Sequence, residues 1–334
     1  MIDPHQVQEN NSQPWAHFVC LAALISALVL YFNGLETDSL FLAAWKDFGH
    51  FLVFGVSTYF LLSVIQIAPH TKHINLKHRL CLAFSVALLF GGLIELIQPY
   101  FGRSRSLIDV LYDASGAFVA CLVYLFAQGT FHSVIGAGIN FLIALICTVV
   151  CALALASPAY YFWLEHRVET RLPILLDFES RDQVALIAPN MGGKLTLTTA
   201  PPEWLGNSSQ VLNIHFAASE YPGARMHSMW PNWSDYRYLN MEIFNPNTQT
   251  LSLSIRINDS SHNQEYADRY NLTRPIEPGH NVLHISLETI EPAPAGRKMN
   301  LAQVEQVIWF MRGEEQKKDE ASKTLYLDNV ALEK

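Results

Sequence analysis

Cysteine is absent from the second half of this 334-residue chain, and the five cysteines of the first half follow no zinc-binding spacing. The second half therefore needs no disulfide to fold, and the cysteines of the first half are best explained by packing. Charged residues make up only 16% of the chain, the formal net charge is −8, and no basic stripe is present. This balance argues against nucleic acid as a partner. The sequence also has no nucleophile elbow, zinc triad or phosphate-binding loop.

The first half does contain long apolar runs. They extend from residue 16 to residue 162, whereas residues 172–334 have the composition of a polar, strand-rich globule. A helix needs about 20 apolar residues to cross the hydrocarbon core of a bilayer. We therefore predict a multi-domain α + β chain, with a transmembrane bundle over 1–160 and a β domain over 168–334. The five predicted spans lie at about 16–33, 48–68, 80–100, 107–127 and 134–156.

Basic residues predict how these helices are oriented. The loop between the second and third spans holds Lys72, Lys77 and Arg79, so the positive-inside rule makes it cytoplasmic. The N-terminus is then cytoplasmic, and the β domain lies outside. The first span has the length of a signal peptide, but acids and no lysine or arginine precede it, which favours a retained helix.

Ionisable residues gather where these helices reach the outer face of the membrane. Such a group costs about 3 kcal/mol at the bilayer centre, so it is rare without a purpose or a partner. The candidates for acid–base catalysis are His50, Glu95 and Asp109. The side chains expected to bind substrate around them are Lys46, Gln98, Arg103, Arg105 and Asp113. The structural alternative is a clamp between helices, in which Arg105 pairs with Asp109.

Two spaced patterns run through this cluster. They are Lys46-x-x-x-His50-x-x-x-Phe54 and Glu95-x-x-Gln98-x-x-x-x-Arg103-x-x-Ser106-x-x-Asp109-x-x-x-Asp113-x-x-Gly116. Over about residues 15–155 the chain resembles the VanZ-like membrane protein family, named for a teicoplanin-resistance protein. Asp113 is a departure, because the family often has asparagine there. The resemblance implies a bacterial inner-membrane protein tied to envelope glycans or glycopeptide antibiotic resistance, without a defined reaction.

The chemistry of the cluster suits an anionic, amphiphilic ligand in the outer leaflet. Arginine forks onto phosphate or carboxylate, and a histidine exchanges protons near neutral pH. A polyprenyl-linked sugar or a peptidoglycan precursor fits this description. Transport of such a head group is an alternative to catalysis, and five spans would then be expected to work as a homodimer.

Alternating apolar and polar residues in the second half predict an antiparallel β-sandwich. The predicted strands are Lys194–Thr199, Val211–Phe216, Tyr238–Phe244, Leu251–Ile257, Val282–Leu287, Val307–Met311 and Thr324–Leu327. A short helix is predicted at Leu301–Gln306, with Asn300 as its N-cap.

Several short motifs punctuate these strands. They are Leu176-Asp-Phe-Glu179, Trp233-Ser-Asp-Tyr236, Ile257-Asn-Asp259, Pro278-Gly279-x-Asn281 and Leu325-Tyr-Leu-Asp328-Asn329. With them this half resembles the galactose-binding-like jelly rolls found among carbohydrate-binding modules. Such folds often hold a calcium ion between an acid near the first strand and one on the last. The matching positions are Glu179 and Asp328, whose hard oxygens suit calcium. The alternative is that both are simple surface acids.

Sugar binding requires aromatic faces beside planar hydrogen-bonding groups. The candidates in the loops of this half are Trp230, His262, Tyr266 and Arg269. For Trp233 a place in the core is the better interpretation, because tryptophan rings are usually buried.

These features predict a membrane protein that acts on or handles an envelope glycan, or its lipid-linked precursor, at the outer face of the inner membrane. Its expected partners are membrane lipids and that glycan. The alternative is a non-catalytic module, anchored by its spans, that binds a glycan or a protein. The sequence leaves open whether the chain is an enzyme.

Overall fold

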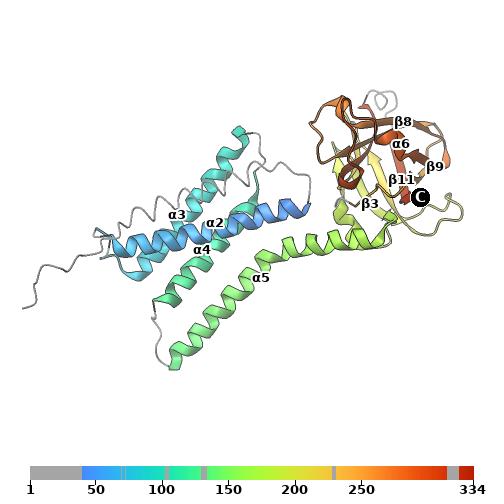
Figure 1. Ribbon diagram of the computed structural model, residues 1–334. Coiled ribbons are helices and arrows are strands. Elements are labelled where there is room, and N and C mark those ends of the chain that lie inside the picture. The colour runs from blue at the N-terminus through green and yellow to red at the C-terminus, as the bar shows by residue number, and fades with distance from the viewer. Residues whose placement is uncertain are drawn as a thin grey trace, which may run out of the picture. The chain divides into compact units, whose positions relative to one another are not determined.

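The structure, a computed structural model, describes residues 40–68, 70, 71, 73–101, 105–128, 134–227, 231–313 and 323–334. These residues form two compact units (Figure 1). One contains Leu42–Ala159, and the other contains Tyr160–Lys334 together with Leu40 and Phe41. Helices followed by antiparallel sheets confirm the predicted α + β class.

The first unit is helical. Its helices are α2 (Leu40–Ile67), α3 (Leu76–Ile97), the 3₁₀ turn η1 (Gln98–Phe101), α4 (Leu107–Ala127) and α5 (Val134–Arg171), the last of which continues into the second unit. Four helices in the described part of the chain are long and apolar enough to cross a membrane. The sequence predicts five, and the remaining one, at 16–33, lies outside the described residues.

α2 and α5 extend furthest past their predicted bounds. α2 begins at Leu40 rather than 48, and α5 continues to Arg171 rather than ending at 156. An α-helix satisfies its own backbone hydrogen bonds, so nothing forces it to stop where the apolar run stops. Pro158 lies inside α5, just before the boundary between the units, where it removes one of those hydrogen bonds.

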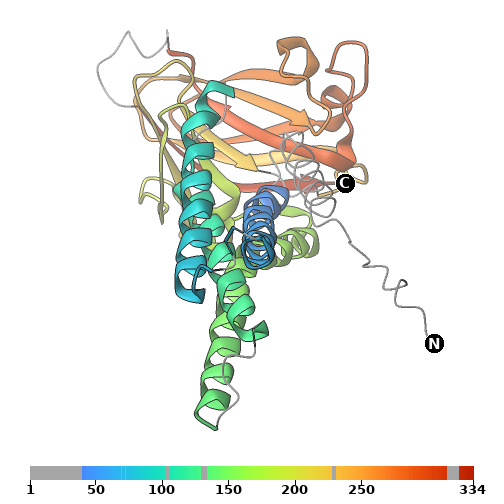
Figure 2. The same cartoon turned by 90° about the vertical axis from the view of Figure 1, so that its left-hand side faces the viewer.

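Glycine allows the helices of the first unit to approach closely. A Cβ atom on Gly116 of α4 would lie 2.1 Å from the Phe51 carbonyl oxygen of α2 and 3.0 Å from the Gly55 nitrogen. A Cβ atom on Gly91 of α3 would lie 2.5 Å from the Asp113 Oδ2 of α4. Small residues at helix crossings are typical of membrane bundles. Figure 2 shows these helices together, with α2 viewed almost along its axis.

The second unit is a sandwich of two sheets in which every strand pairing is antiparallel, as predicted. The six-stranded sheet has the order β3-β4-β11-β6-β9, with β1 paired to β11. Its strands are β1 (Ile174–Leu176), β3 (Lys194–Thr199), β4 (Gln210–Phe216), β6 (Tyr238–Asn245), β9 (Gly279–Ser286) and β11 (Lys323–Glu333).

The five-stranded sheet has the order β2-β5-β10-β7-β8. Its strands are β2 (Ile187–Asn190), β5 (Gly223–His227), β7 (Leu251–Asp259), β8 (Tyr270–Ile276) and β10 (Val304–Phe310). The short helical turns of the unit are η2 (Arg181–Leu186), η3 (Tyr266–Asp268), α6 (Leu287–Ile290) and η4 (Leu301–Gln303).

The helix predicted at Leu301–Gln306 is wrong in its second half. Asn300 does cap a helical turn, since its side chain accepts a hydrogen bond from the Ala302 amide, but η4 ends at Gln303. Val304 begins β10, where it is fully buried and pairs with Asp259 of β7. Burial against a neighbouring strand outweighs the local helix signal at this point.

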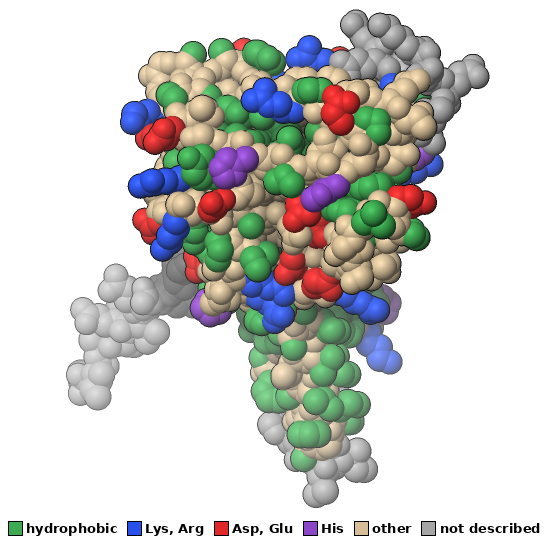
Figure 3. Space-filling model, turned by 90° about the vertical axis from the view of Figure 1, so that its right-hand side faces the viewer, with side chains coloured by type: hydrophobic (Ala, Val, Ile, Leu, Met, Phe, Trp, Pro, Cys, Tyr) green, Lys and Arg blue, Asp and Glu red, His purple; other side chains and the backbone are tan. Residues whose placement is uncertain are grey.

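The larger apolar core of the described part of the sandwich lies between the two sheets. Met241 and Leu212 of one sheet and Ile255 and Trp309 of the other belong to it. Trp233 is also in this core and is 0% exposed, as predicted. In Figure 3 acidic and basic side chains are interspersed over the second unit, whereas mainly hydrophobic side chains cover the helices.

Candidate functional site

The structure brings together one histidine of α2 and two acids of α4. His50 Nδ1 lies 3.0 Å from Asp113 Oδ1, and His50 Nε2 lies 3.9 Å from Asp109 Oδ2. Asp109 and Asp113 are four residues apart, so one face of α4 presents both. Asp113 is only 1% exposed and Asp109 8%. The approach of α2 to α4 at Gly116, one turn further along, allows these side chains to meet.

A third acid, Glu95 of α3, caps the N-terminus of α4. Its Oε2 accepts a hydrogen bond from the Ser106 amide at 2.7 Å, while Ser106 Oγ accepts one from the Asp109 amide at 3.2 Å. In a capping box the helix supplies both groups itself, whereas here another helix supplies the carboxylate. The positive end of the α4 dipole favours acids at this position. Glu95 therefore links α3 to α4.

Two carboxylate oxygens of this cluster remain unsatisfied. Glu95 Oε1 and Asp113 Oδ2 are buried and have no hydrogen-bond partner within the described part of the chain. A buried polar atom without a partner costs about 1–3 kcal/mol. The cluster therefore has the capacity to accept a proton, a water molecule or a polar group of a ligand.

The other side chains predicted to bind substrate in this region differ in how far they are buried. Lys46 is partly buried in α2, and Gln98 is buried at the C-terminal end of α3. Arg105 is exposed just before α4. It makes no ion pair with Asp109, although both residues are described; that carboxylate contacts His50 and Ser106 instead. Arg103 lies outside the described residues.

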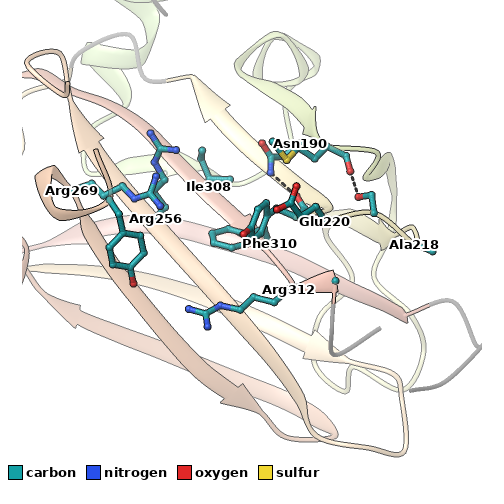
Figure 4. A pocket seen from close by; sticks show the side chains of 13 residues that line it. Asn190, Ala218, Glu220, Arg256, Arg269, Ile308, Phe310 and Arg312 are labelled. Atoms are coloured by element: carbon teal, nitrogen blue, oxygen red, sulfur yellow. Dashed lines mark hydrogen bonds between the residues drawn. The ribbon is translucent and has the colours of Figure 1, made fainter. Parts of the chain in front are cut away.

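A second candidate site is a groove of about 990 Å³ on the sandwich. It lies over the five-stranded sheet, and its lining comes from β2, the β4–β5 loop, β7, η3, β10 and the residues that follow them. Figure 4 shows Arg256 and Arg269 on one side of Phe310 and Arg312 on another. The aromatic lining residues are Tyr221, Tyr266 and Phe310, and the charged ones are Glu220, Arg256, Arg269 and Arg312.

Strand alternation explains why these side chains point into the groove. Ile255 and Ile257 of β7 are 0% exposed in the core, so Arg256 between them faces the other way. Trp309 of β10 is likewise in the core, and Ile308 on its outer side pairs with Arg256 across the two strands. The groove is thus built on the outer face of the sheet.

Stacking and hydrogen bonding hold the basic side chains of the groove in position. Arg269 Nε donates to Asn271 Oδ1 at 3.0 Å, and its guanidinium carbon lies 5.0 Å from the centre of the Tyr266 ring. Arg256 Nε donates to Asn258 Oδ1 at 3.2 Å. Partial burial lowers the pKa of Arg269, because the charged guanidinium loses water.

The predicted glycan-binding residues do not all reach this groove. Tyr266 and Arg269 line it, and Trp230 lies outside the described residues. The His262 side chain is 1% exposed, with Nδ1 2.8 Å from the Asp268 carbonyl oxygen. Burial lowers the pKa of His262. It supports the loop from within and is absent from the described lining of the groove.

Most of the lining residues have no counterpart among the predicted site residues. They include Tyr221, Arg256, Phe310 and Arg312. For Arg256 the signal was present, because it stands between two isoleucines in an alternating strand and must face away from the core. For the others the sequence holds no local signal, since loop and strand ends bring them together.

The two acids predicted to hold calcium are engaged in protein hydrogen bonds. Asp328 Oδ2 accepts from Asn207 Nδ2 at 2.9 Å and from Ser209 Oγ at 2.8 Å. Burial raises the pKa of Asp328, and Glu179 Oε1 accepts from the Gln210 amide at 2.7 Å. A cation would have to displace these donors. The described residues contain no group of three or more His, Cys, Asp or Glu side chains placed to hold a metal.

Comparisons with known proteins give structural neighbours only. No family model matches the chain. No curated protein matches it either. A family 11 carbohydrate-binding module from Clostridium thermocellum, in complex with a β-1,3-1,4-mixed-linked tetrasaccharide, is similar at 13% identity and a TM-score of 0.37, over 48% of this chain and 94% of that one. An exo-β-agarase is similar at 14% identity and a TM-score of 0.37, over 48% of this chain and 25% of that one. A family 28 module described as specific for non-crystalline cellulose gives 13% identity and a TM-score of 0.32, over 48% and 94%.

Proposed function

We propose that this chain is a membrane-anchored glycan-binding protein. Its apolar helices hold it in the membrane, and the groove on the five-stranded sheet binds sugar. The observation that carries this proposal is the groove itself, in which aromatic rings and planar hydrogen-bonding side chains converge over about 990 Å³. Concave sites with a few convergent polar groups are the usual form of ligand sites.

The aromatic rings of the groove suit the apolar faces of a sugar ring. Tyr221 and Phe310 pack edge to face, with ring centres 5.7 Å apart, which fixes both rings. Tyr266 is 61% exposed although its ring is apolar, so a bound sugar would remove that surface from water. Asn190 and the arginines supply hydrogen bonds to hydroxyl groups at the rim.

The test is binding of polysaccharides by the full-length protein in lipid nanodiscs. We expect wild-type protein to be retained by an immobilised glycan from a panel of envelope polysaccharides. Tyr266→Ala and Phe310→Ala should each weaken retention by about tenfold. Tyr238→Ala is the matched control, because this ring stacks on His284 of the other sheet. Absence of binding to every glycan, or equal binding by all three variants, would contradict the proposal.

The cellular setting we propose is the inner membrane of a bacterium, with the sandwich on the outer side. Support comes from the VanZ-like residue patterns and from the basic loop between α2 and α3. Protease added to intact spheroplasts should then remove the sandwich, and digestion only after lysis would contradict this topology.

A second candidate function is action on a lipid-linked glycan precursor by the cluster of His50, Glu95 and Asp109. The specific observation is a histidine beside two acids together with two buried, unsatisfied carboxylate oxygens. Such a set can hold and move a proton. We would compare lipid-linked glycans by mass spectrometry in cells carrying wild-type protein, Glu95→Gln, or the exposed control Glu169→Gln. A precursor that changes only with Glu95→Gln supports this function, and identical profiles leave the helices as an anchor.

A further inference from the structure

The groove of the sandwich is basic although the chain is acidic. Three arginines and one glutamate are among its lining residues, while the formal net charge of the whole chain is −8. The arginines come from β7, from the residue after η3 and from the residues after β10. Folding therefore collects guanidinium groups from separate parts of the sequence at one surface.

Arg297, which lies outside the groove, is paired with acids, and two arginines in the groove are not. Arg297 contacts Asp259 at 2.7 Å and Asp268 at 2.5 Å. Arg269 and Arg312, in contrast, make no ion pair within the described part of the chain. The guanidinium of Arg297 is therefore neutralised within the fold, whereas those of Arg269 and Arg312 keep their charge available to a ligand.

The Arg269 side chain is held ready to receive an anion. Its Nε donates a hydrogen bond to Asn271, and its guanidinium lies over the Tyr266 ring. The side chain is therefore oriented before any ligand arrives. Partial loss of water already disfavours its charge and lowers its pKa. An anionic group would offset that cost, and a neutral hydroxyl would do so much less.

We infer that the groove selects acidic glycans, whose sugar units carry carboxylate or sulfate groups. This inference rests on the proposed glycan-binding function. Arg269 and Arg312 form charge-assisted hydrogen bonds to the anionic group, since the guanidinium fork matches two oxygens at once. The rings of Tyr266 and Phe310 cover the apolar face of the sugar.

Two matched pairs of ligands test the inference by calorimetry, with full-length protein in phosphatidylcholine nanodiscs. One pair is oligogalacturonate and the same oligomer with its carboxyl groups reduced. The other is dextran sulfate and dextran. We expect at least one acidic member to bind about tenfold or more tightly than its neutral partner, with an affinity that falls as salt rises. The acidic polymer that is preferred identifies carboxylate or sulfate as the group recognised.

The double variant Arg269→Gln/Arg312→Gln should lose this preference. Arg274→Gln is the matched control, because this exposed arginine lies on β8 and is not among the lining residues. An unchanged thermal midpoint shows that the double variant is folded, and the single variants replace it if the midpoint falls. Equal binding of acidic and neutral members would overturn the inference and leave glycan binding intact. Binding of neither member would overturn both proposals, and a preference that survives in the double variant would overturn the assignment to the groove.

Discussion

Asp113 in the helical unit and Arg269 in the sandwich are both ionisable side chains that have lost water, yet the protein treats them differently. Asp113 is 1% exposed, and one of its oxygens lies 3.0 Å from His50. Arg269 contacts an amide and a ring but no acid within the described residues. An ionisable group that finds an internal partner contributes to the fold, whatever else it does. One that is oriented without a counter-charge is suited to a ligand.

The same distinction divides the sandwich itself. Asp259 is 0% exposed, and Arg297 binds it through both terminal nitrogens while also contacting Asp268. This arginine ties β7 to η3 and to its own loop. Like Asp113, and unlike Arg269, Arg297 has an ionisable partner inside the protein. Variants of each type should therefore separate stability from binding.

The largest effect is expected from Gly116→Val, which would test whether the helical cluster depends on close backbone approach. Any Cβ atom at this position meets the Phe51 carbonyl oxygen, and backbone cannot move aside as a side chain can. We expect the helical unit to lose about 3 kcal/mol or more of stability. Gly92→Val is the control, because nothing lies within 4 Å of a Cβ atom there. Thermal unfolding in detergent measures both, and equal midpoints would mean that α2 and α4 do not pack in this way.

The next effect concerns Arg297→Gln, which leaves Asp259 and Asp268 without their shared partner. Removing one member of a buried ion pair typically costs about 3 kcal/mol or more, since the remaining charge is uncompensated. Lys298→Gln is the control: its pair with Glu291 is exposed and is worth less than about 1 kcal/mol. Urea unfolding at neutral pH gives both values. If Arg297→Gln lowers the free energy of unfolding as little as Lys298→Gln does, an arginine paired with acids supports the fold no more than an unpaired one.

The loss of stability at acidic pH provides a second test of the ion pair between Arg297 and Asp268. The guanidinium of Arg297 lowers the pKa of Asp268 from 3.8 to about 2. Because the folded value is the lower one, this carboxylate stabilises the fold above pH 3.8, and the stabilisation is lost as the pH falls toward 2. In Arg297→Gln the pKa should return toward 3.8, so stability should depend less on pH over this interval.

The helical cluster could be predicted from the sequence more fully than the groove. Asp109 and Asp113 are four residues apart and so share one face of a helix, and only the packing of the neighbouring helices was needed to bring His50 and Glu95 to them. That Glu95 caps α4 could not be foreseen, because the capping contact crosses between helices.

The groove depends on register, which a single sequence does not contain. Ile308 lies beside Arg256 because β10 and β7 pair at that position, and a slip of one strand by one residue would turn its side chain at this position to the core. Tyr221 and Arg312 follow from where loops leave the sheet. The class of the second unit was predictable from alternation, since that pattern is local.

The smallest effect on stability, and the sharpest test of the comparison, is expected from Arg269→Gln. The change removes a stacking contact with Tyr266, worth about 1 kcal/mol or less at an exposed ring, and a hydrogen bond to Asn271 that glutamine can partly replace. The change also removes a charged guanidinium that is partly buried without an acid beside it. Removing this desolvation cost offsets part of the stability lost with the stacking contact and the hydrogen bond. The free energy of unfolding should therefore change by less than about 1 kcal/mol, while the affinity for an acidic glycan falls about tenfold. Arg297→Gln should give the reverse order, with a large loss of stability. If Arg269→Gln instead unfolds the sandwich as readily as Arg297→Gln, its guanidinium supports the fold, and the absence of an acid beside it no longer identifies a binding site.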